Sequence, residues 1–146
     1  MKILILLGLV AAFVLALIQG QHKMIYYPRP YPSGLKLPAG VIALEYTTGQ
    51  GSQTAFYRPP LGGENGSVTS LWLVFGGNAS LALGWTDFLA DFPDRGAGFL
   101  LIDYPGYGRS RGRASPESIL ESTEKALAAL VDRIKSKSSG LAENKV

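Results

Sequence analysis

The fold is decided by the stretch LWLVFGGNAS, residues 71–80, together with FLLIDYPGYGRS, residues 99–110. Each stretch opens with a continuous apolar run, Leu71–Phe75 and Phe99–Ile102, and each run ends in a turn rich in glycine or proline. Short apolar runs bounded in this way are typical of strands that are buried on both faces of a parallel sheet. We therefore expect two buried parallel strands here.

Helical periodicity follows each of these strands. The first is followed by a predicted amphipathic helix over 81–92, whose apolar face consists of Leu81, Trp85, Phe88, Leu89 and Phe92. After the second, Ser115 is a candidate N-cap and Pro116 suits the first helical position, so a helix is expected to run to about Lys135. Its apolar stripe is expected to comprise Ile119, Leu120, Thr123, Leu127, Leu130, Val131 and Ile134, with a polar tail over 136–146.

A β-hairpin precedes these elements. Val41–Tyr46 alternates between apolar and polar residues, Thr54–Arg58 is a second short strand, and Gly49 and Gly51 lie between them. The order is a hairpin and then β-α-β-α, which indicates an α/β fold with helices packed on the faces of the sheet. The last helix should lead into another parallel strand, and none follows before Val146, so the sheet is expected to be incomplete at the C-terminus.

Composition excludes several kinds of site. The chain has 146 residues, which favours one domain, and it contains no cysteine, which excludes disulfide scaffolds, thiolate metal sites and catalytic thiols. His22 is the only histidine, which leaves little room for a histidine-based metal site or a complete catalytic triad. A net charge of +3 is too weak to indicate nucleic acid as a partner. We therefore expect no metal, no cofactor and no nucleic acid.

The N-terminus carries an apolar run, Ile3–Ile18. In a helix it would span about 24 Å, between the length of a signal-peptide core and that of a bilayer span. Three interpretations stay open: an uncleaved membrane anchor through residues 3–18, a signal peptide cleaved after residue 16 or 20, and a buried core helix. Either of the first two places the main domain outside the cytoplasm, and cleavage would make it secreted or periplasmic.

A proline-rich segment separates this run from the domain. Residues 21–40 contain Pro28, Pro30, Pro32 and Pro38, and proline favours extended backbone. The segment is predicted to be a semi-rigid linker that lifts the domain, residues 41–146, off a membrane. His22 would then be an interfacial residue.

The turn Gly76–Ser80 is the first candidate site. A glycine turn between a strand and a helix leaves backbone N–H groups free, and such groups can hold a phosphate or a developing oxyanion. The plain alternative is a tight β-α turn. The chain contains neither a P-loop nor a dinucleotide-binding glycine pattern.

The loop after the second strand holds three further features. Gly108–Gly112 matches the G-x-S-x-G elbow of serine hydrolases, but Ser110 is expected to be a decoy, because it lies far from a strand-to-helix turn and no histidine follows it. Its arginines are either solvated or bind an anion or lipid headgroup: Arg109, Arg111 and Arg113. Asp103 is expected to accept backbone N–H groups in its turn.

Together these residues resemble the third and fourth strands of the α/β-hydrolase superfamily, in the membrane-anchored branch that is similar to serine aminopeptidases and monoglyceride lipases. There one strand ends in His-Gly-Asn-Ala, matched here by Gly76–Ala79, and the next ends in Asp-Tyr-Arg-Gly-Tyr-Gly-x-Ser, matched by Asp103–Ser110. The resemblance covers roughly residues 22–146. In the family's sheet order, Leu71–Phe75 lies between Phe99–Ile102 and a strand that is missing here, which would leave it as an exposed edge.

The resemblance implies an oxyanion hole built from the backbone of Gly77, Asn78 and Ala79, with Gly76 in place of the family's histidine. The family's nucleophile, acid and histidine lie beyond the second helix, and this chain lacks all three. The resemblance therefore implies the N-terminal portion of a serine hydrolase that acts on an ester, amide or thioester bond in a small-molecule, lipid or peptide substrate, and that is inactive as this chain alone. The alternative is a membrane-anchored, non-catalytic interaction module derived from the same fold.

Overall fold

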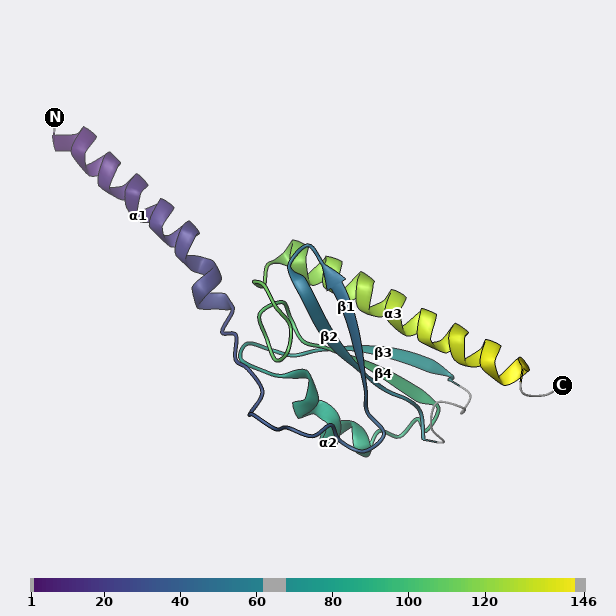
Figure 1. Ribbon diagram of the computed structural model, residues 1–146. Helices are drawn as coiled ribbons and strands as arrows, with labels where there is room; N and C mark the ends of the chain where they lie inside the picture. Colours follow the sequence, from purple (N-terminus) through teal and green to yellow (C-terminus); the bar gives the residue numbers. More distant parts are fainter. Residues whose placement is uncertain (1, 62–67, 144–146) are drawn as a thin grey trace.

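A computed structural model describes residues 2–61 and 68–143, and for Leu4, His22, Lys23 and residues 138–143 it describes the backbone alone. The fold is α/β, with an N-terminal helix, a four-stranded mixed sheet and a C-terminal helix (Figure 1). In chain order the elements are α1 (Lys2–Ile25), β1 (Ile42–Thr48), β2 (Gly51–Arg58), β3 (Ser70–Phe75), η2 (Ala82–Trp85), α2 (Thr86–Ala90), β4 (Ala97–Ile102) and α3 (Pro116–Glu143).

The strands lie in the order β1-β2-β4-β3. β1 and β2 form the expected antiparallel hairpin, and β2 is also antiparallel to β4. β3 and β4 are parallel, with Phe75 opposite Ile102. The two central apolar runs are therefore neighbouring parallel strands, as predicted. Every residue of β4 is buried, which confirms the prediction for Phe99–Ile102.

The prediction from the apolar run that Leu71–Phe75 is buried on both faces is wrong, whereas the exposed edge beside Phe99–Ile102 that the family's sheet order implies is observed. β3 is the outermost strand of the sheet that the structure describes. Its apolar side chains are consequently exposed, by 37% at Leu71, 49% at Trp72, 39% at Leu73 and 42% at Phe75. The apolar run correctly identifies a strand. Burial of its side chains also requires a neighbouring strand on each side, and within the described residues β3 has a neighbour only on the side of β4.

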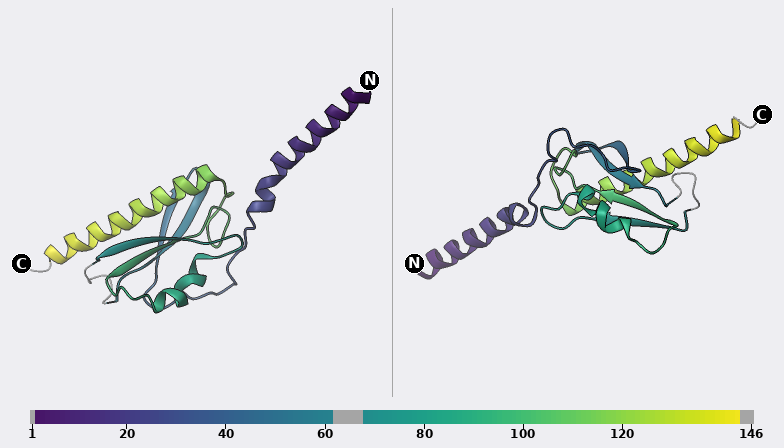
Figure 2. Two further views of the ribbon diagram at one scale, coloured as in Figure 1. Left: turned by 180° about the vertical axis from the view of Figure 1, so that it is seen from behind. Right: turned by 90° about the horizontal axis from the view of Figure 1, so that it is seen from below.

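The sheet is covered on both faces. η2 and α2 lie on one face and α3 lies on the other (Figure 2). The predicted helix over 81–92 is shorter and begins as a 3₁₀ turn, so the α-helical spacing of its apolar residues does not keep them on one face. Leu83 and Leu89 are buried in the core, whereas Phe88 is 70% exposed.

Helix α3 begins as predicted. The Ser118 N–H donates to Ser115 Oγ at 3.1 Å, and the Ser115 N–H donates to Ser118 Oγ at 2.9 Å. In this reciprocal pair each side chain accepts the backbone N–H of the other residue, as in a capping box, so Ser115 is the N-cap of α3. The helix continues to Glu143, beyond the predicted end near Lys135.

The face that α3 buries differs from the predicted stripe. Leu130 is buried, but Leu127, Val131 and Ile134 are exposed. The buried ridge instead consists of small residues at every fourth position followed by that leucine: Ser118, Ser122, Ala126 and Leu130. Small side chains let the helix approach the hairpin closely, and Tyr46 Oη lies 2.9 Å from Ser122 Oγ in a hydrogen bond.

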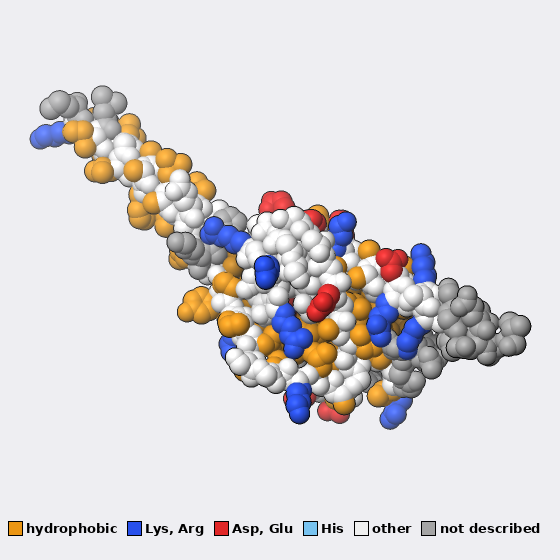
Figure 3. All heavy atoms as spheres, viewed as in Figure 1, with side chains coloured by type: hydrophobic (Ala, Val, Ile, Leu, Met, Phe, Trp, Pro, Cys, Tyr) orange, Lys and Arg blue, Asp and Glu red, His pale blue; other side chains and the backbone are white. Residues whose placement is uncertain are grey.

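Helix α1 projects away from the domain, and hydrophobic side chains cover its length (Figure 3). These side chains are exposed, Ile3 by 75% and Phe13 by 64%, so the run is not a helix of the domain core. Among the residues that the structure describes, none of the helices combines the length and the apolarity that a membrane span requires.

The prediction of an extended linker over residues 21–40 is wrong in part, because residues 21–25 belong to α1 and the rest of the segment contains turns at 33–34 and 39–40 and lies against the domain. The Tyr27 N–H donates to Tyr107 Oη at 2.7 Å, and the Gly108 N–H donates to the Arg29 carbonyl oxygen at 2.9 Å. Pro30 also forms an isolated parallel bridge with Gly108. The segment is therefore fastened to the loop that follows β4.

Candidate functional site

The turn Gly76–Ser80 follows the C-terminal end of β3 directly. It is closed by a hydrogen bond from the Ser80 N–H to the Gly77 carbonyl oxygen, 3.1 Å long. Ala79 has φ of 59°, a left-handed conformation that is uncommon for a residue other than glycine and that often marks a functional turn. Within residues 2–61 and 68–143, the N–H groups of Asn78 and Ala79 donate no hydrogen bond. The turn therefore offers two adjacent free donors.

Two side chains hold this turn in place. Tyr104 Oη donates to the Gly76 carbonyl oxygen at 2.7 Å. Ser80 fills the space beside Gly76, because a Cβ added at position 76 would lie 3.0 Å from Ser80 Cβ. Any side chain at position 76, such as the histidine of the hydrolase pattern, would require Ser80 to shift by a few tenths of an ångström.

Asp103 lies beneath the turn and is almost completely buried. Its Oδ1 accepts the Ala82 N–H at 2.8 Å, so the carboxylate holds the start of η2 rather than its own turn, where sequence reasoning placed its partners. Its Oδ2 has no hydrogen-bond partner within the described part of the chain. Burial raises the pKa of Asp103, and the Ala82 N–H opposes this shift by stabilising the charged form.

Tyr31 brings the proline-rich segment to the same place. Its Oη accepts the Leu83 N–H at 3.1 Å. Burial, and next the charge of Asp103, raise the pKa of Tyr31, so the phenol stays protonated at neutral pH. Asp103 and Tyr31 therefore connect β4, η2 and the segment in one cluster.

The Ser110 hydroxyl is not accessible, as the hydroxyl of a nucleophilic serine would be. Its side chain is buried, and its Oγ accepts the Thr54 N–H of β2 at 3.1 Å. Its own N–H donates to the Tyr107 carbonyl oxygen at 2.8 Å, and α3 begins only at Pro116. The serine of this G-x-S-x-G sequence thus fastens a loop to the sheet.

The three arginines of that loop lie on its surface, and Arg109 Nη2 donates to the Leu35 carbonyl oxygen at 3.3 Å. The structure therefore places Arg109, Arg111 and Arg113 in solvent and uses one of them to hold the proline-rich segment. Binding of an anion or headgroup by this cluster stays a prediction. His22 lies among the residues whose side chains are not described.

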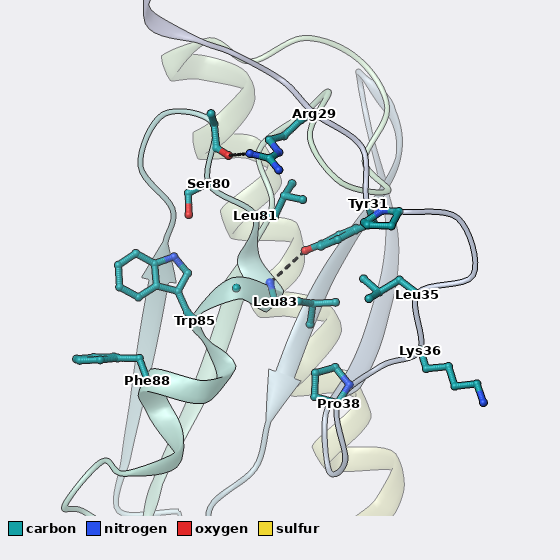
Figure 4. A pocket seen from close by; sticks show the side chains of 13 residues that line it. Arg29, Tyr31, Leu35, Lys36, Pro38, Ser80, Leu81, Leu83, Trp85 and Phe88 are labelled. Carbon is teal, nitrogen blue, oxygen red and sulfur yellow. Dashed lines mark hydrogen bonds between the residues drawn. The ribbon is translucent and has the colours of Figure 1, made fainter.

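An open groove of about 670 Å³ runs beside the turn (Figure 4). One wall is the proline-rich segment and the other is formed by the turn, η2 and α2. Its lining comprises Arg29, Tyr31, Pro32, Leu35, Lys36, Pro38, Ala79, Ser80, Leu81, Leu83, Gly84, Trp85 and Phe88. Sequence reasoning missed this groove, because nothing in the spacing of the prolines shows that the segment folds back on the domain.

Comparison with known proteins finds no match: neither a family model nor a curated protein is similar to this chain. Within the described residues, no group of three histidine, aspartate or glutamate side chains is arranged to hold a metal ion. What the site can do therefore has to be argued from its geometry. It offers free N–H donors at the end of a parallel strand, with an apolar groove beside them.

Proposed function

We propose that this chain carries the oxyanion-binding turn of an α/β-hydrolase, in the branch that is similar to membrane-anchored serine aminopeptidases and monoglyceride lipases. The observation that carries the proposal is the pair of free N–H groups of Asn78 and Ala79 at the C-terminal end of β3. Donors placed in this way stabilise the oxyanion of a tetrahedral intermediate, and one such donor is worth about 10²–10³ in rate.

The sheet supports the same proposal. β3 lies outside β4, and its other edge is open within the described residues. A further parallel strand beside β3 would end next to the turn, which is where the resemblance implies the nucleophile. A serine there would attack a carbonyl carbon whose oxygen accepts the two N–H groups. The substrate bond would be an ester, amide or thioester, and the serine, acid and histidine would come from outside these 146 residues.

The 146-residue polypeptide alone is expected not to hydrolyse esters and not to react with a serine-directed fluorophosphonate. Ser110 is buried, its Oγ is occupied by the Thr54 N–H, and among the described side chains no carboxylate or imidazole forms a hydrogen bond with it, so it is a poor nucleophile. Mass spectrometry of the treated protein checks this, with Ser110→Ala as the matched control. Stoichiometric labelling that is lost in Ser110→Ala would contradict the assignment.

The test of the proposal itself uses a polypeptide extended along the reading frame beyond Val146. We expect an apolar strand and a second G-x-S-x-G sequence within about ten residues, as a strand-to-helix elbow requires. The extended protein should react with the fluorophosphonate at that serine, and Asn78→Pro, which removes one donor, should lower kcat by about 10²–10³. An extension that contains no such serine would contradict the proposal, and so would full activity of Asn78→Pro.

One observation favours the second candidate, a non-catalytic interaction module. Leu71, Leu73 and Phe75 of β3 are exposed on the face of the sheet that carries α3. On α3 itself, Leu127, Val131 and Ile134 are also exposed. Exposed apolar edges of this kind are typical of surfaces that pair with another chain. Two results together would favour this candidate. Residues 26–146 alone would show a cooperative thermal transition and a dispersed amide NMR spectrum, and the extended protein would contain no serine that the fluorophosphonate labels.

We further propose that residues 3–18 anchor the chain to a membrane, with the main domain outside the cytoplasm. We expect the full chain to remain with membranes after washing with high salt and carbonate, because the exposed apolar surface of α1 needs an apolar environment. A variant lacking residues 3–18 is the control and should leave the membrane fraction. A mature N-terminus at Leu17 or Gln21 would instead show a cleaved signal peptide.

A further inference from the structure

We propose that the groove between the proline-rich segment and η2–α2 binds the hydrocarbon chain of a fatty-acid-like carboxylate, with the carboxylate at the turn. This inference deepens the proposed function by naming the acyl class of its substrate or product, and it rests on that function for the reaction. Binding itself requires no nucleophile, so the test below is independent of hydrolysis.

The walls of the groove are apolar. Trp85 and Phe88 stand on one side, Leu35 and Pro38 stand on the other, and Leu83 lies between them (Figure 4). Phe88 is 70% exposed, so most of its ring is open to a ligand. The volume of about 670 Å³ lies within the usual range for sites that take small molecules. An apolar ligand that covers this surface removes it from water, which makes the free energy of binding more favourable.

The polar side chains of the lining are few. Tyr31 Oη accepts the Leu83 N–H, and the uncharged polar side-chain groups that remain in the lining are the Ser80 hydroxyl and the Trp85 indole N–H, which has no partner within the described residues. A peptide or a sugar would bring many donors and acceptors into this groove and leave them unpaired, which costs binding free energy. A hydrocarbon chain brings none, so the lining favours an aliphatic occupant.

The charges orient this occupant. The charged residues of the lining are Arg29 and Lys36, both cationic, and no acidic residue belongs to it. Arg29 Nη1 lies 3.5 Å from the Ala79 carbonyl oxygen, at the turn, whereas Lys36 points away from the groove (Figure 4). The free N–H groups of Asn78 and Ala79 are at the same end as Arg29. A carboxylate is therefore favoured at the turn, with its chain running toward Phe88.

The two tryptophans make this arrangement testable in the full chain. Trp85 lines the groove, whereas Trp72 packs against Phe92 from β3 and does not line it. Bromine quenches indole fluorescence on contact, so terminally brominated octanoate, dodecanoate and hexadecanoate report on the groove. The full chain, held in phosphatidylcholine nanodiscs, is titrated as Trp72→Phe, which keeps Trp85, and as Trp85→Phe, which keeps Trp72.

We expect saturable quenching in Trp72→Phe and little quenching in Trp85→Phe. Affinity should rise with chain length by at most about fourfold per added CH₂ group, the limit for complete burial. Leu35→Asp should weaken binding at least about tenfold by placing a charge in the wall, whereas Leu61→Asp, an exposed leucine outside the groove, should not. Arg29→Gln should weaken binding of the carboxylates more than that of the matching brominated alcohols.

Three results would overturn the inference. Equal quenching of both tryptophans, or quenching that rises linearly without saturation, would show that the acids reach the protein only through the bilayer. Undiminished binding by Leu35→Asp would place the ligand elsewhere. Far-UV circular dichroism of each variant verifies that it is folded, and Leu35 and Leu61 are both partly exposed, so their substitution leaves the core intact.

Discussion

Replacing Gly108 with alanine is expected to destabilise the domain by about 2–5 kcal/mol, the sum of a left-handed backbone and an overpacked side chain. Gly108 has φ of 58°, and a Cβ there would overlap Asp103 Oδ2 and approach Tyr31 Cε2 to 2.6 Å. Neither neighbour can withdraw easily, because Asp103 holds the Ala82 N–H and Tyr31 holds the Leu83 N–H. Chemical denaturation of the full chain in a non-ionic detergent, followed by tryptophan fluorescence, measures the loss.

Gly40 provides the matched control. It has φ of 75°, and an added Cβ would meet nothing within 4 Å. Gly40→Ala therefore carries only the conformational cost, about 1–2 kcal/mol. Equal losses in the two variants would mean that Gly108 serves the backbone alone and that the packing of Asp103 and Tyr31 around it contributes nothing.

The second large effect is expected at Asp103. Asp103→Ala should cost about 2–4 kcal/mol, because the buried Ala82 N–H loses its acceptor and a cavity replaces the carboxylate. The start of η2 and the groove wall that it carries should loosen together. Denaturation measures the stability, and hydrogen exchange at Ala82 and Leu83 locates the loosening. A loss of no more than about 0.5 kcal/mol, the usual range for a surface substitution, would contradict this role.

Asp103→Asn separates charge from hydrogen bonding. Burial raises the pKa of Asp103 above its ordinary value of 3.8, so the folded state holds more protons than the unfolded state between these two pKa values. The free energy of unfolding that Asp103 contributes is therefore fully present below pH 3.8 and falls as the pH rises through the raised pKa. The asparagine side chain does not titrate, and its amide oxygen remains an acceptor for the Ala82 N–H.

We therefore expect Asp103→Asn to gain stability relative to the native chain as the pH rises from strongly acidic to neutral. Urea denaturation of both proteins over that range measures the difference between them, which removes the titration of all other groups. A difference that is constant with pH would show that the pKa of Asp103 is the same in the folded and unfolded states, and would contradict the raised pKa.

The strands and the N-cap could be predicted because local sequence specifies them. The apolar run of β4 and the serine at the start of α3 each act on their own neighbourhood, and the structure has both as expected. The apolar run of β3 does not by itself predict its exposure, which follows only from the family's sheet order. An apolar run shows that a strand prefers to be covered, and only the complete sheet decides whether another strand covers it.

Helix α3 shows a second limit. The predicted stripe counted large apolar residues, but the helix approaches the hairpin through Ser118, Ser122 and Ala126. Small residues carry little hydrophobic signal, and the close approach they permit becomes visible only beside Tyr46. The groove escaped prediction for a related reason. Its walls meet through Arg29 and Tyr31, whose partners lie 50 or more residues away in the sequence.

The attachment of the proline-rich segment also fixes how far the turn lies from the end of α1. α1 ends at Ile25, and the backbone of Arg29 is fixed to Gly108. The chain between these two points spans at most about 14 Å, so the domain cannot swing its turn far from the end of α1. If α1 lies in a membrane, as proposed, a molecule that diffuses laterally in that membrane reaches the turn without entering bulk water. The search is then two-dimensional, and the rate of encounter follows the surface density of the ligand rather than its concentration in solution.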